Sequence, residues 1–261
     1  MIDVIKYSLR RVPTGPGTVL HRSLRAINLQ FSERVVTLLN KEGTITPSSI
    51  VLDVDYIPAI NKAKFENDML HTDSFEAHMR SNTDLSFHPQ KKLNTKNIRN
   101  LLRSYIIPKE RSIMIAVLLT EGYLKKLPAK SFEVAIMQEQ AKRILRCESV
   151  EDAARLLLGI GFGLTPSGDD FILGSIALMH LVGLSATSLR PIIIRYTNAL
   201  SRTMLLDGID GYFSQPLLDV LNALDNGSNL EAKILRLEKI GHTSGYDVIA
   251  GMYYAASYFI P

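Results

Sequence analysis

Cysteine is almost absent from this chain. Among 261 residues there is one, Cys147, which excludes an internal disulfide framework and a cysteine-rich metal site. Cys147 follows the helical pattern of residues 134–145. We therefore interpret it as a half-buried structural thiol and not as a nucleophile.

Long apolar runs are also missing. The longest, residues 171–184, contains His180 and is too short for a membrane span, although it suits a buried helix. The N-terminus has no secretory-signal pattern, because Asp3, Lys6, Arg10 and Arg11 are mixed with its apolar residues. We expect a cytoplasmic protein with no membrane partner.

Charge is modest and mixed. The formal net charge is +4, with 46% hydrophobic and 21% charged residues, which is ordinary for a soluble globular protein. This excess favours small acidic metabolites as much as nucleic acid. One basic stretch comprises Lys91, Lys92, Lys96, Arg99, Arg103, Lys109 and Arg111. No aromatic residues are interleaved in it, so we predict a solvated helix face and no nucleic-acid partner.

The first 60 residues favour strands. Short β-branched segments at 18–20, 26–29, 35–39 and 49–54 are separated by turn signals rich in glycine and proline. This pattern predicts an antiparallel sheet or a small barrel. Residues 61–94 are polar, and their composition assigns no element.

From residue 95 onward the pattern is helical. Ile98, Leu101, Leu102 and Tyr105 have the spacing of one helix face. Further helices are expected at 131–146, 150–158, 168–184, 188–206, 215–225, 230–240 and 245–259. The predicted fold class is α+β, with an N-terminal antiparallel β module, residues 1–94, followed by a mostly helical C-terminal domain, residues 95–261.

Two of these predicted helices carry local signals at their ends. Ser149 with Asp152 resembles a capping box, and Gly159 is a plausible stop for the helix that they begin. Gly211 to Leu218 contains Ser214 as an expected N-cap and Pro216 in the first turn. We interpret this second group as the boundary of a helix and not as a ligand contact.

An internal repeat is the most informative feature. Residues 167–174 align without gaps to residues 244–251, and five of the eight positions are identical: serine, glycine, aspartate, isoleucine and a second glycine. The first copy follows Thr165-Pro166 and the second follows His242-Thr243. Both copies stand at the expected starts of helices.

The residue types in each copy suit a helix N-terminus. Ser167 and Ser244 are expected N-caps, and an acid three residues later, Asp170 or Asp247, completes a capping box and complements the helix dipole. A glycine after each serine, Gly168 or Gly245, permits close approach to backbone amides. Gly174 and Gly251 indicate tight helix packing, because glycine weakens a helix.

Two interpretations are open. The two turns are either simply the starts of buried helices, or they face each other and form a site. In the second case Thr165, Ser167, Gly168, Thr243, Ser244 and Gly245 would bind a small anion. Asp169, Asp170 and Asp247 could hold Mg²⁺ or Mn²⁺. Asp169, which has no counterpart in the second copy, is expected to be the freer carboxylate.

His242 is the candidate general acid or base, with a structural hydrogen-bonding role as the alternative. Together with Asp169, Asp170 and Asp247 it makes the predicted catalytic set. HExxH, Walker A and GxSxG motifs are absent. Gly161-Phe162-Gly163 lacks the third glycine of a dinucleotide fingerprint. Ser167 lacks nucleophile-elbow glycines, so a serine hydrolase is disfavoured.

Both turns, the Gly211-Tyr212-Phe213 segment and residues 21–29 (HRSLRAINL) resemble the AllH-like family. The likeness spans about residues 15 to 255 and is loose between 55 and 130. It implies a subunit of an oxamate carbamoyltransferase, which converts oxalurate and phosphate to oxamate and carbamoyl phosphate in purine and allantoin catabolism. It also implies partner subunits.

Three functional hypotheses follow. The first is a carbamoyltransferase subunit with the two turns as anion sites. The second is a stand-alone metal-dependent hydrolase or phosphotransferase acting on a small acidic metabolite. The third is a non-catalytic ligand-binding or assembly subunit.

Overall fold

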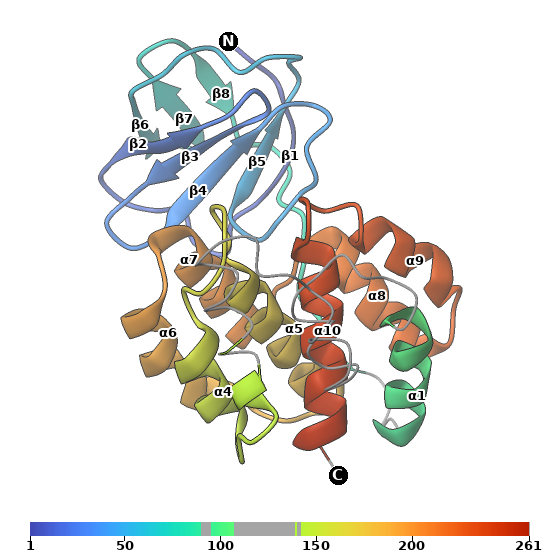
Figure 1. Cartoon of the computed structure of the whole chain (residues 1–261). Coiled ribbons are helices and arrows are strands. Elements are labelled where there is room, and N and C mark those ends of the chain that lie inside the picture. Colours follow the sequence, from blue (N-terminus) through green and yellow to red (C-terminus); the bar gives the residue numbers. More distant parts are fainter. Residues whose placement is uncertain (90–94, 107–138, 140–141, 261) are drawn as a thin grey trace.

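The computed structural model describes residues 1–89, 95–106, 139 and 142–260. An eight-stranded sheet lies at the N-terminal end, and helices fill the rest of the molecule (Figure 1). This confirms the predicted α+β class, with a β-rich N-terminal part before a mostly helical C-terminal part. No helix in the described part of the chain is long and apolar enough to cross a membrane.

The sheet has the order β1-β5-β4-β3-β2-β6-β7-β8. Its strands are β1 (Val4–Ser8), β2 (Pro16–Arg22), β3 (Ala26–Gln30), β4 (Val35–Leu39), β5 (Ser49–Leu52), β6 (Lys62–Glu66), β7 (Met69–Thr72) and β8 (Glu76–His78). All described pairings are antiparallel except that of β4 with β5, which is parallel. The predicted antiparallel module therefore contains one parallel pair.

Three strands lie where composition assigned nothing. β6 and β7 form a hairpin whose turn is Asn67-Asp68, with both residues at positive φ (49° and 58°). Positive φ at two successive turn residues is the geometry of the tight hairpin turn that matches strand twist, and asparagine and aspartate tolerate it. That dipeptide was the local signal for the hairpin.

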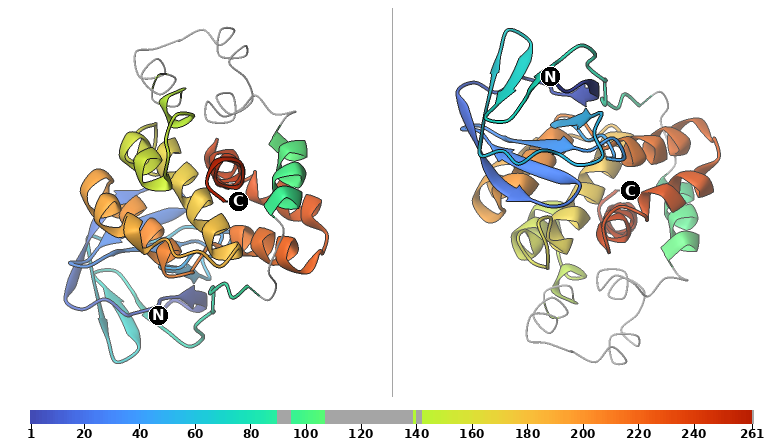
Figure 2. Two further views of the ribbon diagram at one scale, coloured as in Figure 1. Left: turned by 90° about the horizontal axis from the view of Figure 1, so that it is seen from below. Right: turned by 90° about the horizontal axis from the view of Figure 1, so that it is seen from above.

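The described helices are α1 (Thr95–Ile106), α4 (Val150–Leu157), α5 (Ser167–Leu181), the 3₁₀ turn η1 (Thr187–Leu189), α6 (Arg190–Tyr196), α7 (Ala199–Ile209), α8 (Gln215–Asn226), α9 (Leu230–Leu237) and α10 (Ser244–Tyr258). α5 and α10 lie side by side in the middle of the helical region (Figures 1 and 2). Most of the expected helix at 131–146 lies outside the described residues.

One predicted helix, at 188–206, is wrong as a single element. The chain leaves the helix at Thr197, which is extended (φ −127°, ψ 165°), and α7 then restarts behind the N-cap Asn198. The Asn198 side chain accepts a hydrogen bond from the Ser201 amide (3.0 Å). Asparagine competes with helical backbone bonding in this way, which favours a new start over continuation.

Other local predictions are confirmed. Ser149 caps α4, because its hydroxyl oxygen accepts from the Asp152 amide (3.1 Å). Gly159 follows α4 at φ +78°. Ser214 holds the N-cap position of α8, with Pro216 in the first turn. Cys147 is half-buried, and burial raises its thiol pKa, the opposite of an activated nucleophile.

The sheet and the helices have separate hydrophobic cores. Leu29, Leu38 and Ile50 are fully buried in the sheet core. Leu85 and Phe87, which follow the sheet, are buried in the helical core. Residues preceding the expected boundary at 94/95 thus contribute to the helical region, and the boundary itself stays a prediction.

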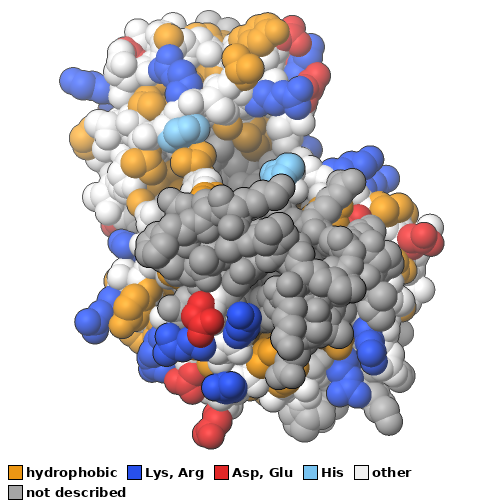
Figure 3. Space-filling view, viewed as in Figure 1, with side chains coloured by type: hydrophobic (Ala, Val, Ile, Leu, Met, Phe, Trp, Pro, Cys, Tyr) orange, Lys and Arg blue, Asp and Glu red, His pale blue; other side chains and the backbone are white. Residues whose placement is uncertain are grey.

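The predicted basic helix face is described only in part. Arg99 is half-buried and Arg103 is exposed, and the side chains of Lys91, Lys92, Lys96, Lys109 and Arg111 lie outside the described residues. On the face shown in Figure 3 the described Lys and Arg side chains are spread over both regions and mixed with acidic ones. No stripe of described basic residues marks this face.

Candidate functional site

The two turns belong to two copies of a helix pair. An eight-residue helix, α4 or α9, precedes each turn, and a 15-residue helix, α5 or α10, follows it. Side chains cap both short helices: Ser149 caps α4 and Asn229 caps α9. The internal similarity seen over eight residues therefore extends to a whole helix–turn–helix unit.

The first glycine of each copy is fixed by helix packing. A Cβ at Gly168 would lie 1.9 Å from the Leu157 carbonyl oxygen, and one at Gly245 would lie 2.0 Å from that of Leu237. Both oxygens belong to the last residue of the preceding short helix. No side chain fits at such distances, so these glycines serve the contact between the helices of each pair, and close approach of a ligand is not needed to explain them.

The second glycine of each copy joins α5 to α10. A Cβ on Gly174 would lie 1.9 Å from the Val248 carbonyl oxygen, and one on Gly251 would lie 1.8 Å from that of Phe171. Each glycine thus faces the same repeat position of the other helix, so the two copies are related by a local twofold. The Ser175 hydroxyl also donates to the Gly251 carbonyl (3.1 Å). This confirms the predicted tight packing.

The predicted serine caps are wrong. α5 and α10 begin at Ser167 and Ser244 themselves, and neither preceding residue, Pro166 or Thr243, makes a side-chain cap hydrogen bond. The helix amides are bonded to backbone instead. The amides of Asp169 and Asp170 donate to the Pro166 carbonyl (2.8 and 3.1 Å).

Three further amides of these first turns are also bonded to backbone carbonyls. The Gly168 amide donates to the Ile160 carbonyl (2.9 Å), and the Gly245 amide donates to the Ile240 carbonyl (3.3 Å). The Asp247 amide donates to the Thr243 carbonyl (3.0 Å). These donors are satisfied inside the protein, so they are not available to hold an anion in this structure.

The first turns of the two long helices face each other, as the second interpretation required. Asp170 of α5 is 3% exposed and Asp247 of α10 is fully buried. The pKa of Asp170 is raised to about 8, mainly by burial; the charges of Asp247 and Asp169 add to the rise, and the side chains of Ser244 and Thr165 oppose it. The turns therefore enclose a buried carboxyl pair in which Asp170 is mostly protonated at neutral pH.

Asp169 is not the freer carboxylate. It is fully buried, its Oδ1 accepts from the Gly159 amide (2.7 Å), and its Oδ2 accepts from the Thr197 hydroxyl. Burial raises its pKa, and these two donors oppose that rise. Asp169 thus ties α5 to the end of α4 and to the break between α6 and α7. The expectation failed because Thr197 and Gly159 meet it only in the folded chain.

No described residues form a metal site. The described part of the chain contains no group of three or more His, Cys, Asp or Glu side chains able to hold an ion. Asp169 is committed to internal hydrogen bonds, and Asp170 favours its neutral form. The Mg²⁺ or Mn²⁺ site predicted at Asp169, Asp170 and Asp247 thus has no support in the geometry.

The residues before each turn lie on different cavities. His242 is exposed and lines an open cavity of about 610 Å³ with Glu238, Lys239 and Tyr246. Its repeat counterpart, Thr165, is half-buried and lines a smaller cavity of about 220 Å³ between sheet and helices. The structure therefore brings the predicted aspartates together with Ser244 and Thr165 but leaves His242 accessible at the surface.

The smaller cavity is lined by hydroxyl groups that bond to their neighbours. The Thr37 hydroxyl donates to Asn28 Oδ1 (2.8 Å), and the Ser48 hydroxyl donates to Asp207 Oδ2 (2.7 Å). Asn28 lies in the 21–29 segment that resembles the family, and with the predicted binding residue Thr165 it was the sequence signal for the cavity. Its remaining walls include the apolar residues Val35, Leu39, Pro47, Leu200 and Met204.

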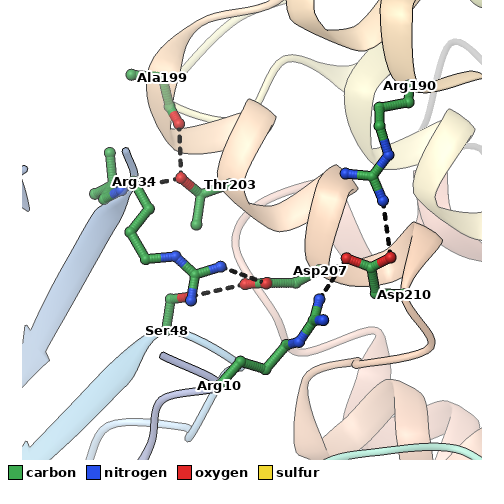
Figure 4. Close-up of polar contacts among 9 residues, drawn as sticks. Arg10, Arg34, Ser48, Arg190, Ala199, Thr203, Asp207 and Asp210 are labelled. Atoms are coloured by element: carbon green, nitrogen blue, oxygen red, sulfur yellow. Dashed lines mark hydrogen bonds and ion pairs between the residues drawn. The ribbon is translucent and has the colours of Figure 1, made fainter. Parts of the chain in front are cut away.

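Ion pairs join the sheet to α6 and α7 (Figure 4). Arg34 pairs with the buried Asp207 (2.7 Å), and Asp210 pairs with both Arg10 and Arg190 (2.8 Å to Arg190). Burial raises the pKa of Asp207, and Arg34 opposes that rise. The sequence did not reveal this group, because its members are far apart in the chain and belong to no motif.

Comparison with known proteins agrees with the position of the turns. A family model described as oxamate carbamoyltransferase subunit AllH matches residues 157–256, from the end of α4 into α10. No solved structure matches the chain. The matched segment contains both turns and every described element between them. The match thus confirms the resemblance to the AllH-like family over residues 157–256.

Proposed function

We propose that the chain is a subunit of an oxamate carbamoyltransferase-like enzyme. In this proposal the complete enzyme converts oxalurate and phosphate to oxamate and carbamoyl phosphate, within purine and allantoin catabolism. The observation that carries the proposal is the family match, because it covers the segment that contains both turns. We infer partner subunits because the family consists of one subunit of this enzyme.

The reaction sets clear chemical demands. A phosphate oxygen attacks the carbamoyl carbon of oxalurate, the bond from that carbon to the oxamate nitrogen breaks, and the nitrogen takes a proton. The enzyme must therefore hold two anions and supply a proton donor. In this chain the accessible candidate donor is His242, on the open cavity beside the second turn.

The burial of the acidic residues favours a binding or assembly role for this chain. Asp169, Asp170 and Asp247 are at most 3% exposed. Catalytic residues must reach the substrate, whereas these carboxyl groups are enclosed among the helices. We therefore propose that the predicted anion-binding residues Thr165, Ser167, Thr243 and Ser244, all half-buried, act only when a partner subunit completes the site.

Stand-alone metal-dependent chemistry has no supporting observation, because no described residues form a metal site. The two remaining hypotheses, a catalytic subunit and a ligand-binding subunit, are compatible. They differ in whether His242 takes part in the reaction.

The test uses the complex purified through a tag on this chain. Carbamoyl phosphate is detected by adding carbamate kinase and ADP and measuring ATP. We expect ATP formation that requires both oxalurate and phosphate, with none from the chain alone. A purified complex that never phosphorolyses oxalurate contradicts the proposed function.

A matched pair of variants tests His242. We expect His242→Ala to slow turnover about 100-fold if the imidazole is the proton donor. Arg236→Ala, at an exposed position on α9 outside the cavity, is the control and should leave turnover unchanged. Equal rates for both variants would assign the chain to the binding role.

A further inference from the structure

A second cleft lies between the sheet and the helices, away from both turns. Its volume is about 400 Å³. Four arginines line it: Arg10 and Arg11 from the loop after β1, Arg34 from the turn before β4, and Arg190 from the first residue of α6. Segments far apart in the chain thus bring guanidinium groups to one place.

Carboxylates in the cleft balance only part of this charge. Glu33, Asp207 and Asp210 also line it, so the four arginines exceed the acids by one formal charge. Figure 4 shows Arg10, Arg34 and Arg190 converging on the two aspartates of α7 and its end. The cleft is therefore positive and rich in hydrogen-bond donors.

The ion pairs leave donors unused. Asp210 divides its oxygens, one for Arg10 and one for Arg190, so each of these guanidinium groups gives Asp210 a single nitrogen. Arg34 binds Asp207 through Nη2, while its Nη1 is buried without a hydrogen-bond partner. Since a guanidinium has five N–H donors, the cleft lacks acceptors.

We propose that this cleft binds a small oxyanion through Arg34, Arg10 and Arg190. Planar guanidinium groups match the oxygens of phosphate and carboxylate, often two at a time. An oxygen of the ligand would supply the acceptor that Arg34 Nη1 lacks, and Asp207 and Asp210 hold the guanidinium groups in place for it. The proposal concerns binding alone and stands separately from the proposed reaction.

The side chains differ in how far they are exposed. Arg190 is 40% exposed and Arg10 is 28% exposed, so a ligand can reach both from solvent. Arg34 is 16% exposed and pairs with a buried acid, so its removal would leave that buried charge unpaired and destabilise the fold. Arg190 is therefore the residue to change, because Asp210 keeps Arg10 as a partner.

The experiment is calorimetric titration of the full-length chain with inorganic phosphate and, separately, with oxamate, at constant ionic strength. We expect saturable binding of at least one anion. Arg190→Gln should weaken it about tenfold, a loss typical of one charged contact. Arg195→Gln, at an exposed position on the same helix outside the cleft, should change it less than about twofold.

The phosphate titration and the oxamate titration both test for binding of an oxyanion. Tighter binding of phosphate identifies a phosphate ligand, and tighter binding of oxamate identifies a carboxylate ligand; either outcome supports the oxyanion site. Thermal unfolding of both variants confirms that they fold. The proposal is overturned if neither anion gives saturable heat up to about 10 mM, a limit beyond ordinary specific binding. It is also overturned if both variants weaken binding equally.

Discussion

The two helix pairs, α4 with α5 and α9 with α10, share their packing but not their surroundings. In both, the first glycine of the turn rests on the preceding short helix and the second rests on the opposite long helix. The first pair meets the sheet through Thr165, and the second presents His242 to solvent. The two copies thus share their helix packing, but they differ in which residues a ligand or a partner can reach.

Asp169 is the clearest difference. Tyr246 stands at its place in the second copy, and the loop before the first turn, residues 158–166, is longer than that before the second, residues 238–243. In the first copy the Gly159 amide of this loop donates to Asp169. The extra acid therefore fixes the start of the loop to α5, and its oxygens are engaged inside the protein.

Among the substitutions, the largest expected loss of stability is at the contact between the two copies. We expect Gly251→Ala to lower the free energy of unfolding by about 3 kcal/mol, because the new Cβ would overlap a backbone oxygen that cannot move aside alone. Urea denaturation measures it. The control is Gly208→Ala in α7, where a Cβ meets the end of the Leu173 side chain; it should change stability by less than about 1 kcal/mol. Equal effects would mean that the glycine contact is not structural.

The extra acid of the first copy comes next. Asp169→Asn should lower the free energy of unfolding by about 2 kcal/mol. Both carboxylate oxygens now accept hydrogen bonds, and the amide nitrogen of asparagine would place a donor opposite one of those donors. Asp170→Asn should cost less at pH 7, since Asp170, with its pKa near 8, is already mostly neutral. The comparison is measured by denaturation, and it fails if Asp170→Asn is the more costly change.

The pH dependence of stability tests the buried carboxyl pair. The pKa of Asp170 is about 8 in the folded protein against 3.8 ordinarily, so the folded state holds the proton more tightly. The contribution of this proton binding to the free energy of unfolding is complete below about pH 4. It is lost as pH rises from 4 to 8, at about 1 kcal/mol per pH unit. Unfolding between pH 5 and 8 should show this slope in the wild type relative to Asp170→Asn. Parallel curves for the two proteins contradict it.

The smallest effect concerns the residues before each turn. His242→Ala should change stability by less than about 0.5 kcal/mol, as for most exposed positions. Thr165→Val at the matching position should lower the free energy of unfolding by about 1 kcal/mol, because the Thr165 side chain hydrogen-bonds the buried Asp170. Thermal unfolding resolves the difference. If His242→Ala proved the more destabilising change, the exposure argument would be wrong.

Local patterns predicted much of the fold. Apolar spacing located α4, α5, α8, α9 and α10 to within a few residues, because each buries one face or all of its surface. Alternating β-branched segments located β2 to β5. The break at Thr197 was missed because it depends on Asn198 as a cap and on Asp169, from another helix, as a hydrogen-bond acceptor.

The arrangement of the two turns was anticipated better than the chemistry of their residues. Identical residues in two turns left facing helices as one of two interpretations, and α5 and α10 do pack against each other. The glycines and aspartates were interpreted as ligand groups, yet carbonyl oxygens and buried carboxyl groups occupy the space around them. Helix propensity and capping statistics describe a single helix, so they contain no information on what a second helix places opposite.

By itself the sequence determined the order of a β-rich part and a helical part, the repeated turn and the resemblance that the family model confirms. These features depend on residues close together in the chain. The tertiary structure alone decided that the acids of the turns are buried, and that four arginines from three separate segments meet in one cleft. Burial and the convergence of charges depend on contacts between distant residues, and no local pattern encodes them.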